Sequence, residues 1–171
     1  MGIFKIEVDN FEWISGAKDD PQDRCLHGHV TVQIGDTVLE EIGTVSATAL
    51  LLLKTLTEDK IMARFEIQVI PCCAHTLFAN QELTEVTISG CDLGTDWSTF
   101  HEEDTVRLIL PTGQEEVVPL VDYTKEVLRF ADKVEQFYQS CSPKEIPEDE
   151  FERNGYITFW NEWRRRYKEA T

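Results

Sequence analysis

The chain has 171 residues, a formal net charge of −16 and a hydrophobic content of 42%. This length suits one folded core, and the hydrophobic content excludes an intrinsically disordered chain. An acidic excess of this size repels phosphate backbones and anionic membrane surfaces, so we expect neither nucleic acid nor membrane as a partner. A basic protein, a cationic small molecule or a metal ion suits the charge better, unless the acidity serves only solubility.

The sequence also bears on the compartment in which the chain works. The start, Met1 to Asp9, alternates apolar and charged residues and lacks the apolar segment of a secretory signal. The longest uncharged apolar run, Ile42 to Leu53, is too short to span a bilayer. Five cysteines are an odd number, which favours reduced thiols over a disulfide framework. We therefore expect a cytoplasmic protein of the bacterial type.

The first part of the chain predicts strands and one helix. Residues 3–8 alternate apolar and charged side chains, which predicts a strand. Residues 27–34 alternate again, and the turn signal Gly35-Asp36 predicts a β-hairpin with residues 37–39. Residues 44–59 are rich in helix-forming residues and begin with a threonine and a serine that suit a cap. The middle of this helix is apolar on every side, so we expect it to be buried, across a sheet face.

More strands are predicted after this helix. Residues 65–70, 85–89 and 106–110 each show the alternation or the β-branched content of a strand. A proline- and glycine-containing turn at 111–114 leads into 115–120, which returns as the partner strand.

Beyond residue 121 the period of the apolar residues changes to that of a helix. An apolar stripe at helical spacing begins at Tyr123, and Asp122 is the predicted N-cap. Residues 140–144 are predicted to form a linker. Pro147, followed by three acidic residues, indicates the first turn of a second helix, in which Gly155 marks an interruption.

Runs of strands followed by runs of helices predict an α+β fold. We expect an antiparallel sheet, one buried inserted helix and a helical C-terminal third. Residues 1–171 are predicted to form a single domain, with mainly strands over 1–121, a helix near 44–59 and helices over 122–171.

Cysteine and histidine residues gather in two short segments of the sequence. Zinc prefers four Cys or His ligands, often supplied as short pairs that the fold brings together. In a strand, residues 25, 27 and 29 share one face because the side-chain period is two. We therefore hypothesise that the two segments meet and bind a metal, with the candidate ligands Cys25, His27, His29, Cys72, Cys73 and His75.

Two other interpretations of these residues stay open. Cysteine is commonly a small buried hydrophobic residue, the adjacent Cys72 and Cys73 cannot share one face of a regular strand, and no CxxC pair is present. A thiol catalyst would instead pair Cys72 or Cys73 with a histidine. The chain has no phosphate-binding glycine loop, G-x-S-x-G elbow or H-E-x-x-H helix, so we assign no catalytic residue and lean away from an enzyme.

Aromatic residues recur at helical spacing near the end of the chain. Tyr156, Trp160, Trp163 and Tyr167 suit the packing of this helix onto the sheet. Because Trp and Tyr are also favoured anchors of protein interfaces, Trp160, Trp163 and Tyr167 are the candidate interface residues.

These features favour an acidic cytoplasmic binding protein of the immunity or antitoxin type, which neutralises a basic protein partner. The likeness to such proteins is one of size and charge, because no residue motif carries it. The alternative is a zinc- or thiol-dependent enzyme, or a zinc-stabilised module, that uses segments 25–29 and 72–75. A third class, an interaction scaffold, would show stable self-assembly, for example through an exposed sheet edge.

Overall fold

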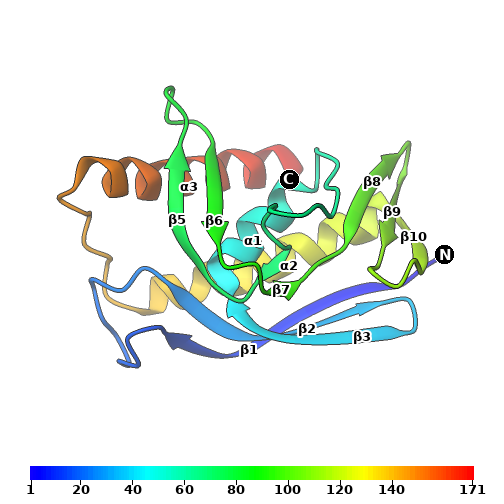
Figure 1. Cartoon of the computed structure of the whole chain (residues 1–171), viewed down its shortest axis with the longest axis horizontal. Helices are drawn as coiled ribbons and strands as arrows, with labels where there is room; N and C mark the ends of the chain where they lie inside the picture. Colours follow the sequence, from blue (N-terminus) through cyan, green and yellow to red (C-terminus); the bar gives the residue numbers. More distant parts are fainter.

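A three-stranded antiparallel sheet forms the base of the molecule in the computed structural model, which describes residues 1–171 (Figure 1). Its strands are β1 (Phe4–Trp13), β2 (Leu26–Ile34) and β3 (Thr37–Thr44), in the order β1-β2-β3. Along β2 every second residue is buried, as its alternation predicts. The predicted hairpin is confirmed, and its turn uses Gly35 at a φ of 59°, which glycine adopts without steric cost.

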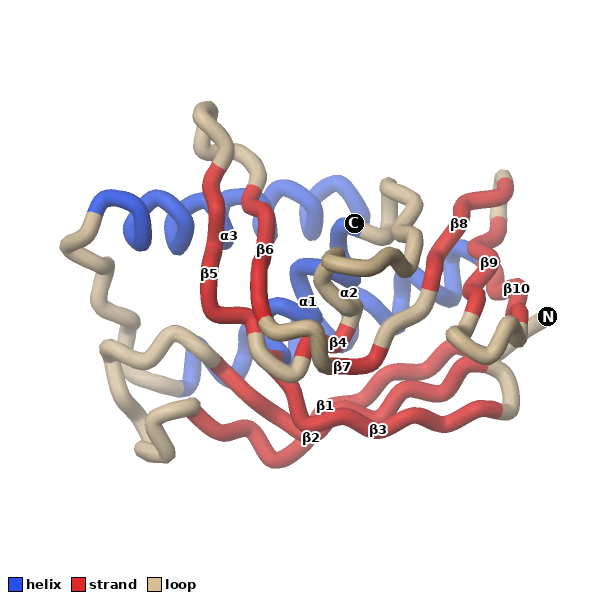
Figure 2. Tube along the Cα trace, in the orientation of Figure 1, coloured by secondary structure: helices blue, strands red, loops and turns tan.

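Helix α1 (Val45–Lys54) lies at the centre of the fold. Figure 2 shows the sheet below α1, and the last helix, α3 (Glu150–Ala170), above it. The residues of α1 from Val45 to Leu53 are all buried, which confirms the predicted burial. The helix ends earlier than residue 59, at the point where the Thr55 hydroxyl donates a hydrogen bond to a carbonyl of the last turn (2.7 Å).

The predicted strand over residues 65–70 is wrong except at its end. Only β4 (Ile70–Pro71) is extended, and it pairs with β7 (Gly94–Thr95). Phe65 has a φ of 72° and is 79% exposed, which is incompatible with a paired strand. The carboxylate of Asp96 accepts a hydrogen bond from the backbone N–H just before β4 (2.9 Å), so a side chain takes the place of a strand partner and holds this segment as a loop.

Two further strand groups stand above the base sheet. β5 (Ala74–Ala79) pairs with β6 (Val86–Gly90), and β8 (Ser98–Glu102), β9 (Thr105–Ile109) and β10 (Glu115–Pro119) form a sheet in the order β10-β9-β8. The strands predicted at the positions of β6, β9 and β10 are confirmed to within one residue. Strands β5 and β8 were not predicted, because their polar and apolar residues do not alternate.

Two long helices form the C-terminal third, as predicted. Helix α2 (Leu120–Ser140) begins before Asp122, so the prediction that Asp122 is the N-cap is wrong: the chain passes directly from Pro119, the last residue of β10, into the helix. Asp149 caps α3 by accepting a hydrogen bond from the N–H of Glu152 (3.0 Å). The α+β fold with antiparallel sheets, one buried helix and a helical C-terminal third is therefore confirmed. None of the helices combines the length and the apolar composition that a bilayer crossing needs.

Helix α2 covers the free edge of β1. Arg129 donates a hydrogen bond to the carbonyl of Ile6 (2.8 Å), and the Glu126 carboxylate accepts one from the Ile6 N–H (3.4 Å). Arg129 also pairs with Glu7 on the same strand at 2.7 Å. An open strand edge is a template for pairing with other chains, so these contacts make β1 a poor edge for self-assembly.

Gly155 does not interrupt α3, contrary to the prediction, but lets the helix approach β5. The helix is continuous through this buried residue. A Cβ at Gly155 would lie 2.5 Å from the carbonyl oxygen of Leu77, closer than side chains pack in protein interiors. Close packing of the helix on the hairpin therefore requires a glycine here.

We expect Gly155→Ala to lower the free energy of unfolding by about 1–3 kcal/mol. Alanine is favoured over glycine inside a helix by about 1 kcal/mol, but the clash with Leu77 pushes α3 away from β5 and outweighs that gain. Urea unfolding measures the change, and Asn161→Ala, on an exposed position of the same helix, is the control. A Gly155→Ala protein as stable as the wild type would contradict this packing.

Candidate functional site

The two Cys/His segments meet near the point where β3 joins α1. The Sγ of Cys25 lies 3.9 Å from Nδ1 of His27, and Nε2 of His27 lies 3.4 Å from the hydroxyl oxygen of Thr44. The same hydroxyl accepts a hydrogen bond from the N–H of Ala74 (3.1 Å), at the start of β5. The two segments thus lie side by side.

The other candidate ligands point elsewhere. His29 lies on the outer face of the base sheet, with its Nδ1 3.1 Å from the carboxylate of Asp9. His75 contacts a neighbouring threonine hydroxyl, and the Sγ of Cys73 accepts a hydrogen bond from the N–H of Cys91. No group of three or more Cys, His, Asp or Glu residues is placed to hold a metal ion. The zinc hypothesis therefore gains no ligand set from the structure.

The Cys–His pair that a thiol catalyst would need at Cys72 or Cys73 is not formed. The side chain of Cys73 interacts with Cys91, and burial and the same Cys91 raise the pKa of Cys72. The close Cys–His contact joins Cys25 and His27 instead, and burial raises the pKa of the Cys25 thiol to about 11. Such a thiol is protonated near neutral pH and is a poor nucleophile. The Cys25–His27 pair therefore lacks the activated cysteine that a thiol enzyme requires.

The aromatic residues of α3 pack largely inside the chain. Trp163 is fully buried, which leaves none of its surface for a partner and removes it from the candidate interface. Trp160 is half-buried, with its ring centroid 5.1 Å from that of Tyr138. Tyr167 is also half-buried and donates a hydrogen bond to the Asp132 carboxylate on α2 (2.7 Å). Trp160 and Tyr167 keep some exposed surface and stay candidate interface residues.

A buried carboxylate fixes α3 against α1 and β6. Glu162 has no exposed surface, and its oxygens accept hydrogen bonds from the N–H of Val86 (2.7 Å) and from Nε of Arg166 (2.7 Å). The ammonium group of Lys54, on α1, lies 3.0 Å from the same carboxylate. Arg166 is itself 4% exposed and also pairs with Glu58. This network, which the sequence analysis missed, sets the position of the helix that forms one wall of the cleft described next.

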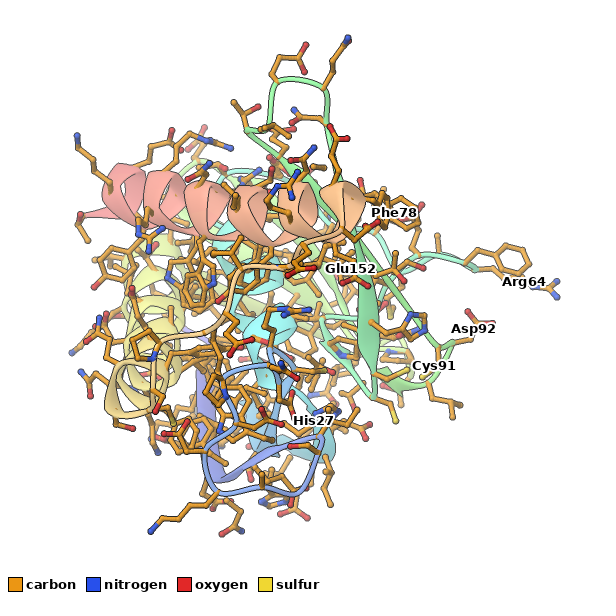
Figure 3. All side chains as sticks on the ribbon, turned by 90° about the vertical axis from the view of Figure 1, so that its left-hand side faces the viewer. His27, Arg64, Phe78, Cys91, Asp92 and Glu152 are labelled. Atoms are coloured by element: carbon orange, nitrogen blue, oxygen red, sulfur yellow. The ribbon has the colours of Figure 1, made fainter.

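An open cleft of about 630 Å³ lies at the end of the molecule that faces the viewer in Figure 3. Its walls come from the N-terminal half of α3, from β5, from the start of α1 and from the loop before β2. Phe151, Tyr156 and Phe159 supply aromatic surface from α3, and Ala74 and Leu77 supply apolar surface from β5. A volume of this size accommodates a small ligand or a few side chains of a partner. We call this hollow the end cleft.

Polar groups line the inner part of the end cleft. Ser46 is 6% exposed, and its hydroxyl lies beside the phenol of Tyr138. Desolvation raises the pKa of that phenol, which donates a hydrogen bond to the carbonyl of Arg24 (2.9 Å). No side chain caps the first turn of α1, so free backbone N–H groups lie beside Ser46. These donors suit a peptide carbonyl or a carboxylate.

Arg24 and Glu152 face each other across the mouth of the end cleft. The guanidinium of Arg24 lies 3.6 Å from the Glu152 carboxylate and 5.8 Å from the centre of the Tyr156 ring. Figure 3 shows Glu152 on α3, above His27 on β2. The Arg24–Glu152 pair is partly exposed, so it contributes little to stability and separates at small cost.

Carboxylates outnumber cations around the end cleft. The linker before α3 is tied to the loop after β1, because Asp19 accepts a hydrogen bond from the Ser142 hydroxyl (2.8 Å) and Lys144 donates one to the carbonyl of Asp20 (2.6 Å). The acidic residues brought together here are Asp19, Asp20, Glu145, Glu148, Asp149, Glu150 and Glu152. They outnumber the basic residues of the same segments, which are Lys18, Arg24, Lys144 and Arg153. The field at this end is therefore negative, like that of the whole chain.

Exposed apolar side chains lie within this acidic surface. Ile14 is 64% exposed, Phe151 is 50% exposed and Phe78 is 47% exposed. The rings of Phe78 and Phe151 meet edge to face with centroids 5.4 Å apart, so they form one apolar surface beside the cleft. A second hollow of about 380 Å³ adjoins the end cleft and includes Trp160 in its wall. Apolar anchors inside a polar rim are the usual anatomy of a protein-binding surface.

Comparison of the chain with protein-family models, with curated proteins and with solved structures gives no match.

Three residues that line the end cleft were singled out from the sequence for other reasons: Cys25 and His75 as candidate metal ligands, and Tyr156 as a packing residue. Ser46 was not predicted to line a cleft, and Phe151 was not predicted to be exposed. No signal in the sequence distinguishes Phe151 from a core residue, because it stands four residues before the buried Gly155 and eleven before the buried Glu162, on the same face of the helix.

Proposed function

We propose that this chain is an acidic binding protein that takes up a basic segment of a protein partner at the end cleft and neutralises that partner, as immunity proteins and antitoxins do. The observation that carries the proposal is the coincidence, at one end of the molecule, of an open cleft, exposed aromatic side chains and an excess of carboxylates. The proposal places the chain in a bacterial cytoplasm, where its five cysteines stay reduced.

Association is proposed to begin with electrostatic steering. The net charge of −16 attracts a cationic partner from a distance of about a Debye length, and the acidic rim orients it toward the end cleft. Steering of this kind raises the association rate more than the final affinity.

The affinity is proposed to come from a few groups inside the end cleft. An apolar side chain of the partner packs against Phe151 and Tyr156, where burial of aromatic surface is favourable. A backbone carbonyl of the partner accepts a hydrogen bond from the hydroxyl of Ser46, which lines the end cleft. A lysine or arginine beside the apolar residue pairs with Asp149 or with Glu152 at the rim.

A library of random peptides displayed on phage tests this proposal without knowledge of the natural partner. We expect peptides selected on the wild-type chain to combine Lys or Arg with an aromatic or large aliphatic residue. Phe151→Ala is expected to weaken their binding by about 2 kcal/mol, or about thirtyfold in Kd, because it removes the central apolar anchor. Isothermal titration with synthetic peptides measures the change.

The matched control is Phe65→Ala, which removes another highly exposed phenylalanine, from the loop before β4. It is expected to leave the Kd unchanged. Selected peptides that carry net negative charge, or an equal loss of affinity in the two variants, would contradict the proposal.

A further inference from the structure

Three cysteines from two separate segments come together at the open end of the β5–β6 hairpin. Cys72 and Cys73 lie between β4 and β5, and Cys91 follows β6. In the register of these strands Ala74 lies opposite Gly90, so Cys73 and Cys91 occupy the next positions along the two strands. The N–H of Cys91 donates a hydrogen bond to the Sγ of Cys73 (3.2 Å), which places the two residues in direct contact.

The three thiols are accessible but differ in their environment. All three residues are partly exposed, and Figure 3 shows Cys91 at the surface beside Asp92. The hydrogen bond between the Cys73 and Cys91 side chains holds the pKa of Cys91 below its usual range and raises the pKa of Cys73. Burial raises the pKa of Cys72. A partly exposed cysteine with a lowered pKa beside a second thiol is the arrangement in which oxidation is selective.

We propose that Cys91 and Cys73 form a site of reversible oxidation, in which Cys91 reacts with a hydroperoxide and Cys73 resolves the product to a disulfide. In the first step the Cys91 thiolate attacks the terminal peroxide oxygen, an S–O bond forms and the O–O bond breaks. Cys91 becomes a sulfenic acid, and hydroxide leaves from hydrogen peroxide or alkoxide from an organic hydroperoxide. In the second step the Cys73 sulfur attacks the sulfenic sulfur, an S–S bond forms, and water leaves with the proton of the Cys73 thiol. The cysteine pair loses two electrons and the peroxide gains them.

The disulfide would close the base of the hairpin that forms one wall of the end cleft. Strand β5 carries Leu77, which lines the cleft, and Phe78, which lies against Phe151. A covalent link between Cys73 and Cys91 restricts the opening of this hairpin, since the two residues flank the paired strands. The chemistry does not depend on the proposed partner, and oxidation and binding are measured separately.

The test treats the native protein with a small excess of hydrogen peroxide, blocks free thiols with iodoacetamide and maps the products by mass spectrometry under non-reducing conditions. We expect a species lighter by two hydrogen atoms in which Cys91 is linked to Cys73, with Cys25 and Cys141 still alkylated. Oxidation of Cys91 is expected to be about tenfold or more faster than that of Cys25, whose raised pKa keeps it protonated. Dithiothreitol should restore the five thiols.

Single variants assign the roles. Cys73→Ser is expected to leave a sulfenic acid at Cys91 that dimedone traps, and Cys91→Ser is expected to abolish the disulfide. Cys72→Ser and Cys141→Ser are controls that retain it, and circular dichroism verifies that each variant is folded. A disulfide that survives Cys73→Ser, direct conversion of Cys91 to sulfinic acid in the wild type, or equal oxidation of Cys25 and Cys91 would overturn the proposal.

Discussion

Glu162→Ala is expected to destabilise the protein by about 3–5 kcal/mol, although it replaces a charged residue on a helix. The carboxylate has no exposed surface and is held by Val86, Arg166 and Lys54. Its removal leaves the buried N–H of Val86 without a partner and Lys54 without its carboxylate, while Arg166 keeps only its pairing with the exposed Glu58. The cost of such unpaired buried groups exceeds that of a lost surface ion pair. Urea unfolding monitored by tryptophan fluorescence measures the change. The urea concentration at the midpoint should fall, while the dependence of the unfolding free energy on urea concentration stays the same.

The matched control is Glu169→Ala on the same helix. Glu169 is exposed and pairs only with Arg165, at 3.3 Å. The control is expected to change the free energy of unfolding by less than about 1 kcal/mol. If both variants lower the free energy of unfolding by the same small amount, α3 is not anchored through Glu162. The wall of the end cleft then lacks the fixed position that the proposed function assumes.

The double substitution Glu148→Lys with Glu150→Lys is expected to weaken binding of a selected cationic peptide by about tenfold to a hundredfold at low ionic strength. Both side chains are exposed and form no ion pair within the chain, so the change acts mainly on the rim charge. A lysine in place of Glu150, in the first turn of α3, costs the fold about 1 kcal/mol or less. The loss should shrink as salt is added, because charges on an exposed rim are screened over about a Debye length. Stopped-flow association at two salt concentrations measures the effect.

The control for this prediction reverses two charges at the opposite end of the molecule. Glu103→Lys with Asp104→Lys changes the net charge by the same amount in the turn between β8 and β9. If affinity depends only on total charge, both double variants weaken binding equally, and the end cleft has no special role. The proposal requires the rim substitutions to have the larger effect.

The parts of the fold that follow from local pattern were predicted from the sequence. The alternation of apolar and polar residues predicted β2 and its hairpin at Gly35, and an unbroken apolar run predicted the buried helix α1. The error over residues 65–70 has a different origin, because the Asp96 carboxylate, distant in sequence, takes the hydrogen bond that a strand would have used. Propensity over a short window carries no information about such a tertiary contact.

The candidate site was less predictable than the fold. Arg24, Ser46 and Phe151 come from three distant segments, and each is unremarkable in its own sequence context. The spacing of Cys25 and His27 correctly suggested proximity, but proximity alone does not make a metal site, because the remaining histidines face other directions. Glu162 and Arg166 stand four residues apart, a spacing at which side chains of a helix meet. The sequence does not show that both side chains are buried, and burial is what makes this pair important for stability.

The central claim is that a basic partner occupies the end cleft, and hydrogen–deuterium exchange of the chain with and without a saturating cationic peptide tests it most directly. The account predicts slower exchange in residues 74–79 and 145–156, which form the walls and rim, and no change in residues 102–116. Protection confined to the outer face of the β1-β2-β3 sheet, or to the β8-β9-β10 sheet, with the end cleft unchanged, would contradict the proposed function.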